Sequence, residues 1–415
     1  MPDNDVYCGI DWASDHHDIA LIDQDGTLVA KARVPDDATG LTTLLDLLAE
    51  HGDTADKPIP VAIETSRGLL VASLRATGRR VYAINPMAAA RYRDRTAVTR
   101  KKSDHLDATV LANILRTDAA AHRPLPADSE LAQAIAVLAR AQQDAVWDRT
   151  QAGNKLRSHL REYFPAFLAA FDDPAKFTGP VARAVLAAVA TPEVAARLTV
   201  GRLRTLLRKA GRQRGLDKEA ARILSALHSP QMRLAPLVEQ AMSQRTLALL
   251  RQLDAACASA DQLEQAAAGA FQTHADAEVI ASFPGLGPLL GARVLAELGD
   301  DHDRFADARA LKAYAGSAPI TRASGKKTSV TARRVKNDRL ASVGYRWAFC
   351  ALTTSPGARA HYDRRRQAGE RHVAALRNLF NRLLGCLHHC LQHHIPYSEA
   401  IAFPTATQDR QGLAA

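Results

Sequence analysis

Four acidic residues occur at positions where strand ends and one helix face can gather their carboxylates: Asp11, Glu64, Asp104 and Asp107. Carboxylate oxygens are the hard ligands that Mg²⁺ prefers in proteins. Two such ions about 3.5–4 Å apart can stabilise both the attacking and the leaving oxygen of an in-line phosphoryl displacement. We therefore predict that these four residues are both the metal ligands and catalytic residues of a two-ion Mg²⁺ site.

The rest of the chain is basic, which indicates a partner for such chemistry. It has 54 Lys and Arg against 44 Asp and Glu, a formal net charge of +10 and a pI near 9.5. This excess predicts binding to the phosphate backbone of a nucleic acid. Charge alone is equally compatible with a basic protein that has no such partner.

The N-terminus and the cysteines indicate the compartment. The first five residues lack a basic leader region, and no apolar run has the length needed to span a bilayer. The five cysteines are odd in number and widely scattered, which is typical of reduced thiols. We therefore expect a cytoplasmic protein with no membrane partner.

The N-terminal region alternates between strand and helix patterns. An antiparallel meander is expected first, and strand and helix then alternate, which predicts a sheet covered by helices with sites at its strand ends. A helix over 103–116 follows, in which Asp104 and Asp107 are three apart and share one face. The expected strands cover 6–10, 18–22, 28–34, 60–63 and 80–84, and the expected helices 39–51 and 68–77.

The remaining chain is predicted to be mainly helical. Residues 128–270 are rich in Ala, Leu, Arg and Gln without a strand pattern, and Ala-rich apolar stripes suit helix pairing within or between protomers. We expect a homo-oligomer, a dimer or a tetramer, joined through this region. The predicted domains are a catalytic domain (1–125), a helical arm (126–274), a mostly α C-terminal domain (275–398) and a tail (399–415).

Any one of the carboxylates taken alone is more often a turn, cap or solvated residue. Together they form a pattern: Asp-Trp-Ala begins at Asp11, Glu-Thr-Ser begins at Glu64, and Ser-Asp-His-Leu-Asp-Ala covers 103–108. This pattern resembles the ribonuclease H-like catalytic domain of RuvC type. More specifically, it resembles the DEDD transposases of bacterial insertion sequences and the related Piv-type invertases.

The resemblance continues in the C-terminal region. The family's Pro-Gly-x-Gly-Pro turn matches 284–288, and its Ala-Tyr-Ala-Gly-x-Ala-Pro segment matches 313–319, after Phe305. Ser324-Gly325 and the basic stretch 326–339 follow in the expected order. The usual Gly-Asn near the end of that stretch is Lys336-Asn337 here, a departure that affects the path of the loop.

The resemblance implies roles that the residues alone do not. By itself, Ser324 is a turn residue for which spacing identifies no base. The family has a serine at the matching place that attacks DNA, so the resemblance implies that Ser324 is the nucleophile of a covalent phosphoserine step. It also implies a RuvC-like fold and a structured guide RNA encoded beside the gene.

Candidate nucleic-acid contacts fall in three segments. Basic side chains precede the Asp104 helix and surround Ser324, and the glycines of the 284–288 turn can expose backbone N–H groups to a phosphate. The alternatives are solvated basic faces and a plain helix–helix turn. The candidates are Arg100, Lys101, Lys102, Gly285, Gly287, Arg322, Lys326, Lys327, Arg333, Arg334 and Lys336.

A second possible metal site is weaker. Cys386, Cys390 and His393 share a helix face, but a single helix rarely offers a closed four-ligand zinc site, and small cysteines facing a core are the simpler interpretation. The resemblance gives zinc no support.

We interpret the chain as an enzyme, a DNA recombinase or transposase of an insertion sequence. Two alternatives stay open: a RuvC-type junction resolvase or nuclease, which needs the acids but no serine, and a non-catalytic nucleic-acid-binding protein. A covalent protein–DNA adduct would distinguish the first, and metal-dependent cleavage would exclude the second.

Overall fold

The computed structural model of the chain describes residues 5–96, 104–325 and 327–404, and only the backbone of 95, 96, 104, 105 and 327. The chain forms two compact units, Met1–Ala127 and Asp128–Ala415. We describe each unit by itself. Within the described residues, no helix is long and apolar enough to cross a membrane.

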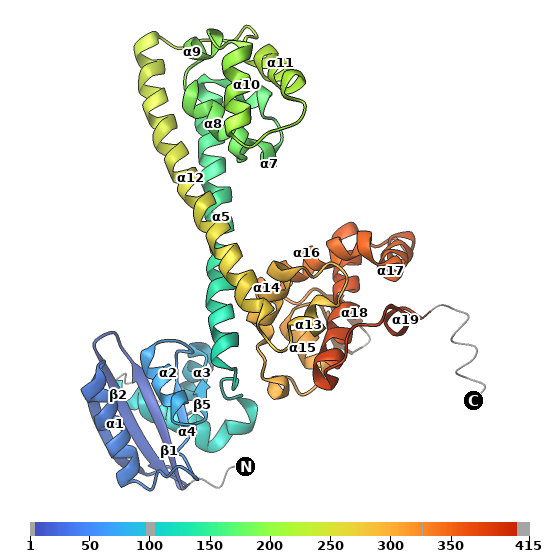
Figure 1. Cartoon of the computed structure of the whole chain (residues 1–415). Helices are drawn as coiled ribbons and strands as arrows, with labels where there is room; N and C mark the ends of the chain where they lie inside the picture. Colours follow the sequence, from blue (N-terminus) through green and yellow to red (C-terminus); the bar gives the residue numbers. More distant parts are fainter. Residues whose placement is uncertain (1–4, 97–103, 326, 405–415) are drawn as a thin grey trace, which may run out of the picture. The chain divides into compact units, whose positions relative to one another are not determined.

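The first unit is built on a mixed sheet, whose described strands have the order β3-β2-β1-β4-β5 (Figure 1). The first three strands form the expected antiparallel meander, and β4 and β5 run parallel to β1. The expected α/β organisation is confirmed. The strands are β1 (Val6–Trp12), β2 (His16–Asp23), β3 (Leu28–Pro35), β4 (Val61–Ile63) and β5 (Val81–Ala83).

Helices cover both faces of this sheet. Cys8 and Ile10 of β1 belong to a core that includes side chains of α1 (Ala38–Glu50) and α2 (Leu69–Ala76). Because side chains alternate along a strand, Gly9 and Asp11 lie on the other face. That face is covered by α4 (Asp104–Asp118), which packs beside α3 (Pro86–Thr96), a helix not expected from the sequence.

The approach of α4 to β1 is unusually close at Gly9. A Cβ atom at this position would lie 2.0 Å from the backbone oxygen of Ala108 and 2.5 Å from the nitrogen of Ala112. Only glycine fits there without moving the helix. At the far end of α4, Arg116 Nη1 donates to the Gln24 carbonyl oxygen at 3.2 Å.

That contact gives the direction of α4. Gln24 follows β2, whose last residue, Asp23, pairs with Val6 at the start of β1. The C-terminal end of α4 is therefore at the start of β1, and its N-terminal end lies towards Asp11. Strand β1 and helix α4 together bring acidic residues from distant parts of the sequence to one edge.

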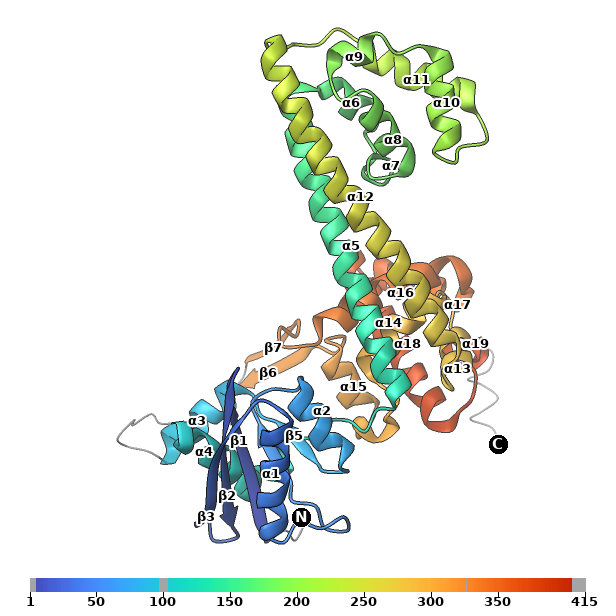
Figure 2. The ribbon, with the colours of Figure 1, turned by 60° about the vertical axis from the view of Figure 1, so that its left-hand side comes forward.

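The second unit contains the long helices expected from the sequence. Helices α5 (Glu130–Tyr163) and α12 (Pro236–Gln272) lie side by side (Figures 1 and 2). With 34 residues, α5 is about 51 Å long. The Tyr163 hydroxyl links the pair, since it lies 2.5 Å from Thr246 Oγ1 of α12 and donates to the Ala190 carbonyl oxygen at 2.7 Å.

Short helices pack against one end of this pair, and we refer to residues 165–235 as the cap. Its core joins the end of α5 to α12 through buried residues such as Phe164, Phe167, Leu203 and Leu207. The described helices of the cap are α6 (Pro165–Ala170), α7 (Pro174–Phe177), α8 (Pro180–Ala188), α9 (Pro192–Ala196), α10 (Val200–Lys209) and α11 (Leu216–Leu227).

A second helical core forms at the other end of the pair, around the fully buried Trp347. Phe283 meets the Trp347 ring edge-on at 5.7 Å. A short antiparallel hairpin, β6 (Ile320–Ser324) and β7 (Lys327–Thr331), interrupts the helices. The described helices here are α13 (Ala277–Ala281), α14 (Pro288–Leu298), α15 (Ala308–Tyr314), α16 (Asp338–Thr354), α17 (Pro356–Gln367), α18 (His372–His393) and α19 (Glu399–Ala402), with a 3-10 turn at His302–Arg304; the first unit has another at Ala119–Ala121, after α4.

We predict that Gly9→Ala destabilises the first unit, because the added Cβ meets helix backbone that cannot rotate away. Overpacking of this kind costs about 1–3 kcal/mol. Thermal unfolding followed by circular dichroism measures the loss. Gly269→Ala in α12 is the control, since a Cβ there meets nothing within 4 Å and alanine favours a helix. Equal stability of Gly9→Ala and the parent chain would contradict the close packing.

Candidate active site

The sheet register places Asp11 and Glu64 next to each other at one edge of the sheet. Ile10 of β1 pairs in parallel with Ile63 of β4. The next residues, Asp11 and Glu64, therefore lie level with one another on neighbouring strands. Asp11 is still within β1, one residue before the strand ends, whereas Glu64 is the first residue after β4. Both side chains are partly exposed, so their carboxylates are accessible.

Helix α4 supplies the other two carboxylates. Asp107 is one turn before Leu111, a residue of the core between α4 and the sheet, so both lie on the sheet-facing side of α4. Its side chain is 15% exposed, and Arg93 Nη2 of α3 lies 2.8 Å from Asp107 Oδ1. Asp104 begins α4, on the same helix face, but its side chain lies outside the described residues. Arg100, Lys101 and Lys102 lie entirely outside the described residues.

The residue types at this edge suit a hard cation. A carboxylate has two oxygens with about four acceptor sites, so Asp107 can hold Arg93 through one and present another to a metal ion. Arg93 would then orient a ligand rather than replace one. Among the described side chains, no group of three His, Cys, Asp or Glu residues is arranged closely enough to hold an ion. The donor set fits Mg²⁺, although its described members are not assembled.

A further acid at this edge was missed by the sequence analysis. Asp18 of β2 pairs directly with Asp11 across the strands, and it is 2% exposed. Two carboxylates at facing positions repel each other. Arg33 of β3 compensates, since its Nε and Nη2 donate to Asp18 at 3.0 and 2.7 Å. The signal in the sequence was weak, because only the hairpin register aligns Asp11, Asp18 and Arg33.

Large apolar side chains are also exposed along this edge. Trp12 ends β1 and is 46% exposed, Leu69 begins α2 after β4 and is 86% exposed, and Met87 lies in the first turn of α3 after β5 and is 64% exposed. An exposed aromatic ring beside an acidic cluster can stack on an unpaired base. The sequence signal for Trp12 was its position directly after Asp11.

The predicted nucleophile is at the tip of the β6–β7 hairpin (Figure 2). Ser324 pairs with Lys327, and Gly325 between them has a φ of +56°, which favours glycine. The Ser324 side chain is exposed, and no described residue hydrogen bonds to its hydroxyl. Ser317, in contrast, is buried and donates to Asn381 Oδ1 at 3.0 Å. The serine that was expected in a loop is thus the last residue of β6.

The basic residues near this hairpin differ in their surroundings. Arg322 and Arg334 are exposed, Arg333 is partly buried, and Lys336 Nζ lies 2.8 Å from Asp338 Oδ1. Lys326 and the side chain of Lys327 lie outside the described residues. Four of the six proposed basic contacts are therefore placed in this unit, and Lys336 is already paired with an acid.

The Lys336-Asn337 pair, in which Lys336 departs from the family pattern, has a clear structural role. Asn337 caps α16, where its Oδ1 accepts from the Leu340 N–H at 2.8 Å. Its Nδ2 donates to Glu297 Oε2 at 2.6 Å and to the Tyr314 hydroxyl at 2.7 Å. The Lys336 stem lies against Gly316, where a Cβ would meet it at 2.2 Å. The end of the loop is therefore firmly attached to α14 and α15.

The glycine turn at 284–288 is partly buried. Gly285 has a φ of +82° and contacts α16, where a Cβ would lie 2.8 Å from the Ala351 nitrogen, and Trp347 Nε1 donates to the Pro284 carbonyl oxygen at 3.0 Å. Gly287 is exposed and is the N-cap of α14, with no side-chain cap. The turn fixes α14 to α16, and only the Gly287 side is accessible to a phosphate.

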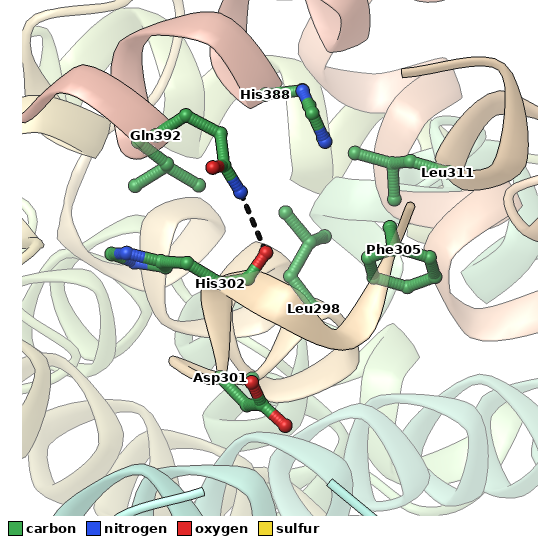
Figure 3. A pocket seen from close by; sticks show the side chains of 9 residues that line it. Leu298, Asp301, His302, Phe305, Leu311, His388 and Gln392 are labelled. Atoms are coloured by element: carbon green, nitrogen blue, oxygen red, sulfur yellow. Dashed lines mark hydrogen bonds between the residues drawn. The ribbon is translucent and has the colours of Figure 1, made fainter. Parts of the chain in front are cut away.

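Among the described residues of the second unit, no cavity adds a group of side chains that could hold a metal ion. A groove of about 220 Å³ is lined in part by Arg333, Tyr345 and Arg377. A much smaller pocket has a volume of about 20 Å³, and two of its lining residues are joined by a hydrogen bond, in which Gln392 Nε2 donates to the His302 carbonyl oxygen at 2.6 Å (Figure 3). It is large enough only for a water molecule, although the figure shows His388 turned toward it.

Of the two cysteines of α18, Cys390 is buried and Cys386 is partly buried. Burial raises the pKa of the Cys386 and Cys390 thiols. Cys390 Sγ contacts the Pro396 carbonyl oxygen at 3.9 Å. Protonated, buried thiols behave as small apolar groups, so their environment supports packing more than metal binding.

Comparisons with known proteins show the family of this chain. Residues 8–165 match a DEDD transposase family model, and residues 277–363 match the transposase family of IS116, IS110 and IS902. The mini-circle protein assigned as the transposase for IS117 of Streptomyces coelicolor is 61% identical over 97% of this chain and 98% of its own. This chain is an IS110-family transposase.

Other relatives of the transposase cover almost the whole chain. A 42 kDa protein of insertion element IS900 from Mycobacterium paratuberculosis is 30% identical over 95% of this chain and 98% of its own. A 44.8 kDa protein of IS116 from Streptomyces clavuligerus is 31% identical, with 92% and 93% covered. The predicted family and enzyme class are therefore confirmed, and the protein acts on DNA.

We predict that Mg²⁺ raises the thermal stability of the transposase and that Asp11→Asn removes this increment. A ligand that binds only the folded state stabilises it by about 2.7 kcal/mol at a hundred times its Kd. Calorimetric scans with and without Mg²⁺ measure both effects.

Asp18→Asn is the control for that experiment. It weakens the pair with Arg33 and should lower the unfolding free energy by roughly 1–2 kcal/mol. Its Mg²⁺ increment should equal that of the parent chain. A lost increment in Asp18→Asn, with an unchanged one in Asp11→Asn, would reverse the two assignments.

Proposed function

We propose that this transposase is a DNA recombinase that cuts and rejoins strands through a covalent link between Ser324 and DNA. Its acidic edge would hold Mg²⁺ on Asp11, Glu64, Asp104 and Asp107, in a first unit with a RuvC-like fold. The observation that carries the proposal is the meeting of two parallel strand ends and the α4 N-terminus at one edge. The mixed sheet, covered by helices on both faces, is consistent with the ribonuclease H-like fold.

The acidic residues and the serine would have different roles in the reaction. When bound, Mg²⁺ supplies electrostatic stabilisation to the charge that develops on the phosphate oxygens. Asp11 and Glu64 would provide ligands from neighbouring strands, and Asp107, oriented by Arg93, would provide one from the helix. Ser324 belongs to the other compact unit, on an exposed turn that a DNA strand can reach.

The covalent step balances without an added reactant. Ser324 Oγ attacks the scissile phosphorus and forms a Ser–O–P bond, while the bond from phosphorus to the 3′ oxygen breaks. The hydroxyl proton passes, overall, to the released 3′ oxygen. A 3′ hydroxyl of another strand can then attack the same phosphorus, which joins the strands and restores the serine.

Further partners of the proposed reaction are a structured guide RNA and additional copies of the chain. The guide rests on the family resemblance alone. Several copies are expected because one chain has one nucleophile, whereas recombination breaks several strands. The apolar stripes of α5 and α12 give less support to an oligomer than the sequence suggested, since the two helices pack against each other. Val137 and Trp147 of α5 remain 69% and 47% exposed.

A nuclease that uses water as its nucleophile is the second candidate. It is favoured by one observation, that no side chain described by the structure forms a hydrogen bond with the Ser324 hydroxyl. Such an enzyme would need the carboxylates but would hydrolyse the phosphodiester without conserving its energy. The two candidates therefore differ in a covalent intermediate.

We predict that Ser324→Ala binds DNA and Mg²⁺ normally but forms no protein–DNA adduct. The measurement is denaturing gel electrophoresis of labelled element-end DNA incubated with the transposase, followed by mass spectrometry of the linked peptide. Asp11→Ala, Glu64→Ala, Asp104→Ala and Asp107→Ala should each abolish both adduct and strand exchange.

Ser329→Ala is the matched control, because Ser329 lies in the same hairpin and pairs with Arg322. It should form the adduct at the parent rate. An adduct that maps to Ser317 or Ser329 would move the nucleophile. Cleavage by Ser324→Ala at the parent rate would favour the nuclease.

A further inference from the structure

The cap at the end of the α5–α12 pair carries most of the chain's excess positive charge. Residues 165–235 contain twelve Lys and Arg and five Asp and Glu, a formal net of +7, whereas the whole chain has +10. The cap packs around a buried core that it shares with α5 and α12, so this charge is not needed to fold it. A small domain with such a surplus must place it on its surface, where it acts on partners.

The cationic side chains of the cap gather on α10 and the turn that follows it. Leu203 and Leu207 face the core. Every exposed charged residue of α10 is basic, namely Arg202, Arg204, Arg208 and Lys209. Arg214 and Lys218 extend the same exposed segment. With no acid among the charged residues of α10, its exposed face has a single sign of charge.

The acids of the cap leave this surface largely uncompensated. Asp217 Oδ1 lies 3.1 Å from Arg204 Nε, and Glu219 lies 3.5 Å from Arg212 and 2.8 Å from Arg222. No described carboxylate lies within 4.0 Å of the remaining cations, which we call the cap cations: Arg202, Arg208, Lys209, Arg214 and Lys218. Unpaired cations on a rigid helix repel one another unless an anionic partner is bound.

We propose that the cap cations bind the phosphate backbone of a nucleic-acid duplex. The guanidinium groups of Arg202, Arg208 and Arg214 suit phosphate, because they donate in a planar fork. The exposed face of α10 has no aromatic or amide side chain, so it offers charge for the backbone and little for base recognition. The contact is therefore independent of sequence. This inference rests on the proposed function only for its setting.

The position of the cap would let this contact orient a bound duplex. Helix α5, about 51 Å long, contributes to the core around Trp347 near its start and to the core of the cap near its end. A duplex that contacts the cap and the Ser324 hairpin of one chain would be held at two distant points. The paired helices make the spacing rigid, so the cap can orient a long duplex, whereas local contacts at the serine cannot.

The test uses the full-length chain and two variants that each remove four positive charges. The cap variant is Arg202→Gln, Arg208→Gln, Lys209→Gln and Arg214→Gln. The matched control is Lys155→Gln, Arg161→Gln, Arg245→Gln and Arg251→Gln, all exposed on α5 and α12. Fluorescence anisotropy measures the Kd for labelled RNA and DNA duplexes of one sequence over a series of salt concentrations.

The cap variant should bind more weakly and with a flatter salt dependence. On duplex DNA, log K decreases with log salt, and the slope becomes less steep by about 0.9 for each phosphate that the protein no longer neutralises. The control variant should keep the parent slope. A variant with Arg202→Lys, Arg208→Lys and Arg214→Lys should also keep it, because it retains every positive charge. Weaker binding confined to the RNA duplex, or to the DNA duplex, supports the proposal and identifies the strand type that the cap holds.

Equally weakened binding in the cap and control variants would overturn the proposal, because general electrostatics would then explain it. Parent-like binding by the cap variant, with a smaller mass in light scattering, would assign the cap to a protein contact instead. Ser324→Ala separates this inference from the proposed reaction. It should keep the parent salt slope while losing the adduct, and the cap variant should still form an adduct at low salt.

Discussion

The close contact between α4 and β1 at Gly9 is the constraint on which the proposed active site depends. The helix backbone lies where a side chain of any other residue would be. Because Arg116 fixes the far end of α4 near the β2–β3 turn, the acidic N-terminal turn lies towards Asp11. A looser helix would leave its acids away from the sheet edge. One missing Cβ thus lets the helix that carries Asp104 and Asp107 lie close against the strand that carries Asp11.

Concentrating acids at one edge has an electrostatic cost that the fold offsets locally. Asp18 faces Asp11 across the strands, and Asp107 lies on the helix above. Arg33 binds Asp18 with two hydrogen bonds, while Arg93 contacts Asp107 through one oxygen. Arg33 neutralises Asp18, whereas the contact with Arg93 leaves oxygen acceptor sites on Asp107 that a metal ion can use. This difference explains how neighbouring acids at one edge can serve structure and metal binding.

The sequence predicted the elements that carry the acids better than the contacts between them. Alternating strand and helix patterns gave the meander and the strand before Glu64, and period-three spacing gave the face of Asp107. The Asp18–Arg33 pair and the place of Ser324 at the end of β6 depend on strand register, which local patterns do not determine. Helix α3 was also missed, because its many arginines hide any apolar stripe. Family resemblance, rather than spacing, identified Ser324.

The distribution of charge connects the two compact units to one kind of partner. An acidic edge repels phosphate unless cations compensate it, so a nucleic acid must be held mainly by basic surfaces elsewhere in the chain. The cap supplies such a surface at the end of a long helical pair, and Arg322 and Arg334 supply exposed charge beside Ser324. Metal ions would then add positive charge where the phosphate reacts. Binding and chemistry can thus be optimised separately, since the residues that attract the backbone are not those that act on it.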